Sequence, residues 1–184
     1  MRVEIIKYSE IKPENLKNAF KEMTGNYLNL EKAVEKSVSI KEDLKKELPM
    51  NFYLNIKEWY KKVISEIDQN NKRRELFLAL ISKEENLHLA GILILKNTEN
   101  EKKICTIRVL ENFRNKGIGT KLFEKSFEYL GTKTPLITLP EECYNKEFKF
   151  LLEKYNFKMT NKVIGAYRKN KIEYFFNEDK WWKY

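Results

Sequence analysis

The hydrophobic pattern of this chain changes its period near residue 75, and this change limits the folds open to it. Before that point, apolar residues recur at helical spacing around Pro13–Met23, Leu30–Val38 and Ile56–Ile67. After it, Glu75–Ser82 and Leu87–Lys96 are dense apolar runs joined by a short polar turn, which is typical of a β-hairpin. The chain is therefore predicted to combine helices with a sheet.

The remaining elements continue this mixed pattern. Val3–Tyr8 alternates loosely and predicts a first strand ahead of the helices. Beyond the hairpin, the spacing predicts a strand, a helix, a short strand, a helix and a closing hairpin that turns at Lys169–Asn170: Lys103–Leu110, Gly117–Tyr129, Leu136–Leu139, Asn145–Lys154, Val163–Tyr167 and Ile172–Phe176. This order predicts a mixed α/β fold with a central sheet.

Length and composition are those of an ordinary globular domain. The 184 residues are 42% hydrophobic and 34% charged, which predicts one compact domain over residues 1–184. No apolar run reaches the roughly 20 residues that span a bilayer. The N-terminus lacks the apolar stretch of a signal peptide. We therefore expect a cytoplasmic protein with no membrane partner.

The sequence offers few residues for metal binding or nucleophilic catalysis. His88 is the only histidine, and Cys105 and Cys143 show no metal-ligand spacing. We expect no metal site and two reduced thiols that serve packing. The formal net charge of +9 favours polyanionic ligands such as nucleotides, nucleic acid or acidic proteins.

The stretch between residues 104 and 123 contains the clearest candidate ligand-binding residues. A predicted strand runs into a turn that holds Arg114, Lys116, Gly117 and Gly119, and a predicted helix follows. The first amides of a helix have no partner within it, and the helix dipole makes that end partly positive. The glycines remove Cβ atoms that would keep an anion from the backbone. This combination predicts a diphosphate cradle, although an ordinary structural turn can use the same residues.

The segment Arg114–Gly119, which reads Arg-Asn-Lys-Gly-Ile-Gly, resembles the R/Q-x-x-G-x-G/A motif of the GNAT superfamily of acetyltransferases. Ile107–Val109 resembles the end of that family's fourth strand. Asn145 with Phe157 further along resembles the family's N-x-x-A…Y-x-x-x-G-F helix. The resemblance covers most of the chain and implies a mixed, mostly antiparallel central sheet flanked by helices.

The resemblance also implies acetyl-CoA as the co-substrate. Backbone groups of Ile107 and Val109 would pair with its pantetheine arm, and the Val109 N–H would face the thioester oxygen. A fixed N–H there stabilises the negative charge that develops when an amine attacks. Asn145 would reach the pantetheine or serve as a plain helix N-cap. The pyrophosphate would lie on the turn amides of Arg114, Asn115, Lys116, Gly117, Ile118, Gly119 and Thr120.

The main departure from the family pattern concerns proton transfer. The family's usual general acid is a Tyr seven residues after the Asn, and here that position is Leu152, which cannot protonate a thiolate. A general base is also needed, because an amine is mostly protonated at pH 7. Glu141 and Glu142 follow the fifth predicted strand and are the candidates. Their alternative role is to begin a helix after Pro140.

We therefore predict a GNAT-type N-acetyltransferase in which a primary amine attacks acetyl-CoA directly. Residues 75–177 would form the acetyl-CoA-binding core, and the helical residues 14–70 would wall the acceptor site. One alternative is a degenerate CoA-binding or protein-interaction module, which Leu152 favours. Another is acetylation of an RNA-linked amine, which the charge permits although no RNA-reading motif is visible. A homodimer is left open, and Trp181–Tyr184 either packs on the sheet or meets a partner.

Overall fold

The computed structural model describes residues 2–48, 53–69, 72–83 and 86–178, so the Trp181–Tyr184 tail lies outside the described residues. A seven-stranded sheet in the order β1-β2-β3-β4-β5-β7-β6 runs through these residues. Neighbouring strands are antiparallel except for β4 and β5, which are parallel. The strands are Val3–Lys7, Arg74–Lys83, Asn86–Asn97, Lys102–Val109, Leu136–Pro140, Met159–Ile164 and Ile172–Phe176, numbered β1 to β7 along the chain. The predicted mixed, mostly antiparallel α/β fold is confirmed.

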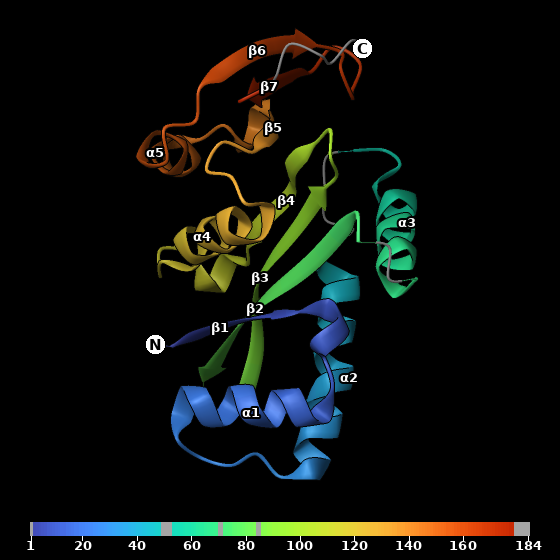
Figure 1. The fold of residues 1–184 in the computed structure, drawn as a ribbon, viewed down its shortest axis with the longest axis vertical. Coiled ribbons are helices and arrows are strands. Elements are labelled where there is room, and N and C mark those ends of the chain that lie inside the picture. The colour runs from blue at the N-terminus through green and yellow to red at the C-terminus, as the bar shows by residue number, and fades with distance from the viewer. Residues whose placement is uncertain (1, 49–52, 70–71, 84–85, 179–184) are drawn as a thin grey trace.

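Helices cover both faces of the sheet (Figure 1). The first three, α1 (Pro13–Thr24), α2 (Leu30–Glu47) and α3 (Ile56–Asp68), pack on one face. The other face carries α4 (Ile118–Leu130) and α5 (Lys146–Lys154). Within the described ranges, no helix combines the length and apolar character needed to cross a membrane.

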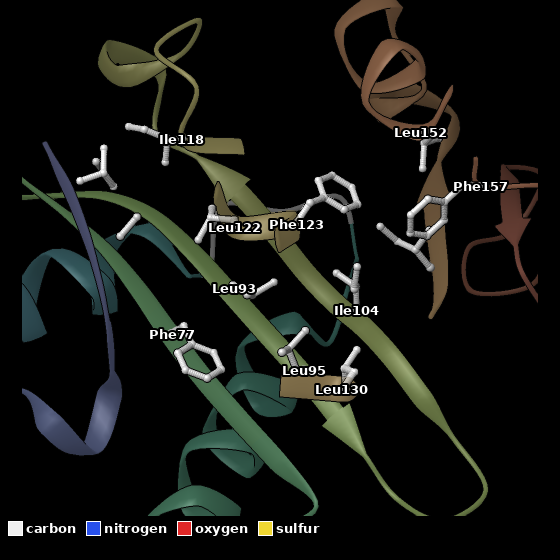
Figure 2. Packing of buried hydrophobic residues seen from close by; sticks show 14 of the residues in the cluster. Phe77, Leu93, Leu95, Ile104, Ile118, Leu122, Phe123, Leu130, Leu152 and Phe157 are labelled. Atoms are coloured by element: carbon white, nitrogen blue, oxygen red, sulfur yellow. The ribbon is translucent and has the colours of Figure 1, made fainter. Parts of the chain in front are cut away.

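Coverage on both faces explains why the central residues of β2 and β3 are apolar. Phe77 and Leu93 point toward the α4 face, whereas Leu76 and Leu78 join the cluster under α1–α3. A strand buried on both sides loses the polar alternation of a half-exposed strand. Figure 2 shows the first cluster, in which Phe123 of α4 lies among side chains from the strands and from the α5 region.

Gly91 of β3 lets α4 approach the sheet closely. A Cβ at this position would lie 3.0 Å from the backbone oxygen of Arg108 and 3.0 Å from Cδ1 of Leu122. Only glycine avoids both contacts, so the start of α4 is held against β3 and β4.

The stripe that predicts α2 lies mostly in solvent. Of the predicted stripe Leu30, Ala33, Val34 and Val38, only Ala33 is buried, because Leu30, Val34 and Val38 are 56%, 46% and 53% exposed. The other buried residues of the helix are Ile40 and Leu44. Asn29 caps it, because the Asn29 side chain accepts a hydrogen bond of 2.8 Å from the Lys32 N–H. The helix was therefore correctly predicted, but its apolar spacing did not identify the buried face.

The predicted strand Val163–Tyr167 is wrong in its bounds. The structure places β6 at Met159–Ile164, and Ile164 pairs with Ile172 of β7. Gly165 then adopts a left-handed φ of +82°, and its N–H donates to the Lys171 oxygen at 2.9 Å. A left-handed residue turns the chain out of the extended conformation, so the turn begins earlier than predicted.

Candidate functional site

A gap opens in the sheet between β4 and β5. The two strands pair only at Lys103 with Leu136 and at Ile104 with Ile137. Against β3, Ile104 faces Leu95 and Thr106 faces Ile94, so Cys105 is an extra residue in β4. Such a bulge bends a strand and raises its twist. Beyond the bulge, β4 turns away from β5, and residues 106–109 pair with β3 alone among the described strands.

The open edge of β4 presents the backbone groups of Ile107 and Val109. The Leu110 N–H donates to the Ala90 oxygen of β3 at 2.9 Å. Backbone groups of successive strand residues point to opposite edges. The N–H and C=O of Val109 and Ile107 therefore point into the gap, while their side chains pack against the core under α4. An open strand edge is a ready partner for another extended chain.

The second part of the site is the turn before α4. Asn115 and Gly117 have left-handed φ values of 59° and 75°. The hydrogen bond that closes the first turn of α4 runs from the Lys121 N–H to the Gly117 oxygen at 3.2 Å. The amides of Ile118, Gly119 and Thr120 precede that bond and lack an intrahelical acceptor. A Cβ on Gly117 would meet nothing within 4 Å, so the chain is open to solvent at the residue that precedes these amides.

Contacts within the turn join this helix end to the gap. A Cβ on Gly119 would lie 3.7 Å from Cγ2 of Val109, so the first turn of α4 lies directly on the end of β4. Ile118 anchors the helix, because its side chain is buried in the core. Arg114 is exposed, and the Lys116 ammonium donates to the Asn112 oxygen at 3.1 Å. Uncapped amides and two cations thus adjoin the open strand edge, which is a favourable place for an anion.

Asn145 and Leu152 lie on or beside α5. Asn145 caps the helix, since its Oδ1 accepts a hydrogen bond of 3.0 Å from the Phe148 N–H. Pantetheine binding by Asn145 stays a prediction and would use Nδ2. Leu152 is buried in the core, as its apolar character requires. Tyr155 packs on Phe123 and donates to Glu124 Oε1 at 3.3 Å.

Glu141 and Glu142 form a short 3-10 turn after β5 and are held in ion pairs. Arg168 donates to both oxygens of Glu142, at 3.0 and 2.8 Å, and these bonds lower the Glu142 pKa to about 2. A hydrogen bond of 2.8 Å from Lys171 and another from the Ile172 N–H lower the pKa of Glu141. A carboxylate with a lowered pKa holds a proton weakly, so these contacts disfavour the predicted general-base role.

Replacing Glu142 with Gln is expected to lower the melting temperature by a few degrees at pH 7. The Glu142 pKa is lower in the folded chain than its ordinary value of 4.5. Its stabilising contribution is therefore complete above pH 4.5 and is lost as the pH falls toward 2. Melting curves recorded by circular dichroism from pH 7 to pH 2.5 should show the difference between wild type and Glu142→Gln shrinking on the acid side. Glu128→Gln is the control, because Glu128 is an exposed carboxylate paired with Lys125. A difference in melting temperature that stays constant with pH would contradict a lowered pKa of Glu142.

A charged cluster that the sequence patterns did not reveal lies at the same end of the sheet. The Tyr53 hydroxyl donates to Oε1 of Glu173 at 2.7 Å, and Arg168 lies over the Tyr53 ring at 5.3 Å. On the other side of the gap, Arg108 of β4 pairs with Glu47 of α2 at 3.3 Å. The one signal in the sequence is an acidic residue, Glu173, inside the otherwise apolar strand Ile172–Phe176.

Comparison with known proteins agrees with this geometry. The acetyltransferase (GNAT) family model matches residues 39–157, which is more than half of the chain. The chain belongs to the GNAT acetyltransferase family. No match was found among curated protein sequences.

Solved structures share the fold at low sequence identity. The ribosomal-protein-S18-alanine N-acetyltransferase from Escherichia coli is 11% identical, with a TM-score of 0.53, over 95% of this chain and 92% of that one. NAA60 from Arabidopsis thaliana, in complex with a bisubstrate analogue, is 14% identical, with a TM-score of 0.51, over 95% and 96%. The PaiA N-acetyltransferase from Thermoplasma acidophilum, in complex with coenzyme A, is 15% identical, with a TM-score of 0.50, over 95% and 98%. At these identities the likeness shows the fold alone.

Proposed function

We propose that this chain transfers an acetyl group from acetyl-CoA to a primary amine by direct attack of the amine on the thioester. The observation that carries the proposal is that the unpaired edge of β4 ends beside the first turn of α4. β5 leaves the edge of β4 at Ile107 and Val109 unpaired, and Gly119 in the first turn of α4 lies next to the Val109 side chain. An extended arm that ends in a diphosphate fits both surfaces at once.

Each part of acetyl-CoA has a chemical partner in this arrangement. The diphosphate accepts hydrogen bonds from the amides of Ile118, Gly119 and Thr120, with Arg114 as a nearby cation. The pantetheine amides pair with the β4 edge. The Val109 N–H then faces the thioester oxygen, where negative charge develops during attack. A donor that is already fixed by β3 stabilises that charge without reorganisation.

The acceptor approaches from the face of the sheet opposite α4. The diphosphate turn belongs to the α4 face, and α1, α2 and α3 cover the other face. An amine that enters the β4–β5 gap therefore passes residues of the 14–70 region, which we propose to wall the acceptor site. Holding the amine and the thioester together supplies several kcal/mol of the barrier reduction.

Two measurements test this function. Titration calorimetry with acetyl-CoA should show saturable one-to-one binding. Release of the CoA thiol should follow when peptides with free N-termini, lysine, polyamines or amino sugars are added. Binding without thiol release for any amine would support the CoA-binding-module alternative, and absence of binding would contradict the whole proposal.

A further inference from the structure

Glu173 is a carboxylate with no accessible surface on β7. It lies opposite Pro140 at the end of β5 and opposite Val163 of β6. Its Oε1 accepts the 2.7 Å hydrogen bond from Tyr53, but its Oε2 has no hydrogen-bond partner in the part of the chain that the structure describes. A buried oxygen without a hydrogen-bond partner destabilises the folded chain, so its presence calls for an explanation.

The Tyr53–Glu173 pair joins the segment before α3 to the β5–β7 side of the gap. Glu47, at the end of α2, is fixed to Arg108 on β4 by an ion pair of 3.3 Å. Tyr53 is fixed to β7, whose Glu173 lies opposite the last residue of β5. These two anchor points, close in sequence, therefore stand on opposite sides of the β4–β5 gap. Tyr53 is only partly buried, whereas Glu173 is fully enclosed, so of these two residues only Tyr53 has accessible surface for a ligand.

The groups around Glu173 leave it able to accept a proton. Burial raises the pKa of Glu173, and the nearby charge of Glu142 adds to this effect. The Tyr53 hydrogen bond and the charges of Arg168 and Lys103 act in the opposite direction, but burial has the larger effect. Burial and the bond to Glu173 raise the pKa of Tyr53, so a free phenolate is disfavoured. A proton can therefore pass through Tyr53 only if another proton leaves it for Glu173.

We propose that Tyr53 and Glu173 form a proton relay that takes the proton of a cationic amine acceptor. This inference rests on the proposed acetyl transfer and names its acceptor class as primary amines that are protonated at neutral pH. Tyr53 is the catalytic residue that contacts the amine, and Glu173 acts through it as a positioning residue that holds the proton. The Leu152 position, which lacks a hydroxyl, then has no part in this step.

The transfer balances in atoms and charge. The ammonium N–H proton moves to the Tyr53 oxygen while the Tyr53 hydroxyl proton moves to Oε1 of Glu173. The freed nitrogen lone pair forms the N–C bond, and the C–S bond breaks. The second proton of the attacking nitrogen passes to the sulfur and gives the thiol. Glu173 returns its proton to solvent through Tyr53, so ammonium and thioester become amide, thiol and one released proton.

The test compares Glu173→Gln, Tyr53→Phe and the double variant with wild type. Each variant should bind acetyl-CoA within about twofold of wild type. Each should lose about 10²–10³ in kcat at pH 7 with little change in KM. The double variant should be no slower than either single variant, because the two residues act as one unit. The variant rates should rise about tenfold per pH unit toward the amine pKa, since only neutral amine then reacts, while wild type changes far less.

A matched control and distinct outcomes keep the test decisive. Glu101→Gln also removes a buried carboxylate, one paired with Lys96 in another part of the fold, and should leave the rate unchanged. Variants with wild-type kcat, or with a wild-type pH profile that is merely scaled down, overturn the relay. Should Glu173→Gln fail to fold, the pH profile of Tyr53→Phe decides alone. Failure of the proposed function is separate, because wild type itself would then bind no acetyl-CoA or release no thiol.

Discussion

Gly117→Val is expected to weaken acetyl-CoA binding by about ten- to a hundredfold. The new side chain would project from the residue directly before the first amides of α4, where the diphosphate is proposed to lie, and no other group fills that space within 4 Å of its Cβ. Loss of hydrogen bonds to a charged group costs about 1.5–3 kcal/mol, which corresponds to this range. Titration calorimetry of wild type and variant with acetyl-CoA measures the change directly.

The matched control for this substitution is Gly25→Val. Gly25 ends α1 with φ of +77°, nearly the φ of +75° at Gly117, and a Cβ on either residue meets nothing within 4 Å. Both variants therefore carry the same left-handed strain of about 1–2 kcal/mol. Only Gly117→Val should lose affinity. Equal affinities in the two variants would refute the diphosphate cradle.

Phe123→Ala is expected to lower the free energy of unfolding by about 3–5 kcal/mol. The Phe123 ring is fully buried on α4, and four aromatic rings surround it with centroids 5.5–6.1 Å away: Phe127, Phe148, Tyr155 and Phe157. Removing it leaves a cavity between α4, α5 and the residues that directly follow α5. Equilibrium unfolding in urea, followed by circular dichroism, gives the value.

Phe150→Ala is the control for Phe123→Ala, because it removes an aromatic ring that is mostly exposed. Phe150 lies on α5 and is 65% exposed, so its removal should change the free energy of unfolding by less than about 0.5 kcal/mol. A loss of less than 1 kcal/mol in Phe123→Ala would show that the aromatic cluster is not packed as described.

Local patterns predicted the elements of this fold well and their pairings poorly. Helical spacing marked α1 and α4 because each helix buries one face, and Gly25 and Gly131 close them in left-handed conformations. The extra residue at Cys105 left no trace in the sequence. A bulge exists only relative to the neighbouring strand, and β3 contacts β4 through tertiary structure. The gap that depends on this bulge therefore could not be predicted from local sequence patterns.

The two halves of the candidate site differ in the same way. The turn from Arg114 to Thr120 is contiguous, so its glycines and cations could be read together. Tyr53 and Glu173 are separated by 120 positions and meet only because the segment before α3 reaches β7 in the folded chain. Glu141 and Glu142 were singled out for their place after β5, but the residues that neutralise them, Arg168 and Lys171, come from the β6–β7 turn. The sequence therefore shows that Glu141 and Glu142 are acidic, but only the fold shows which basic residues pair with them.

The two residue pairs that join β4 to β5 make this region a seam between two parts of one sheet. An occupant that hydrogen-bonds to the free β4 edge fills the seam and binds only the folded chain. At a hundredfold excess over its Kd, such an occupant adds about 2.7 kcal/mol of stability. Resistance of the chain to heat and to proteases would then rise and fall with the cellular concentration of its own acyl donor.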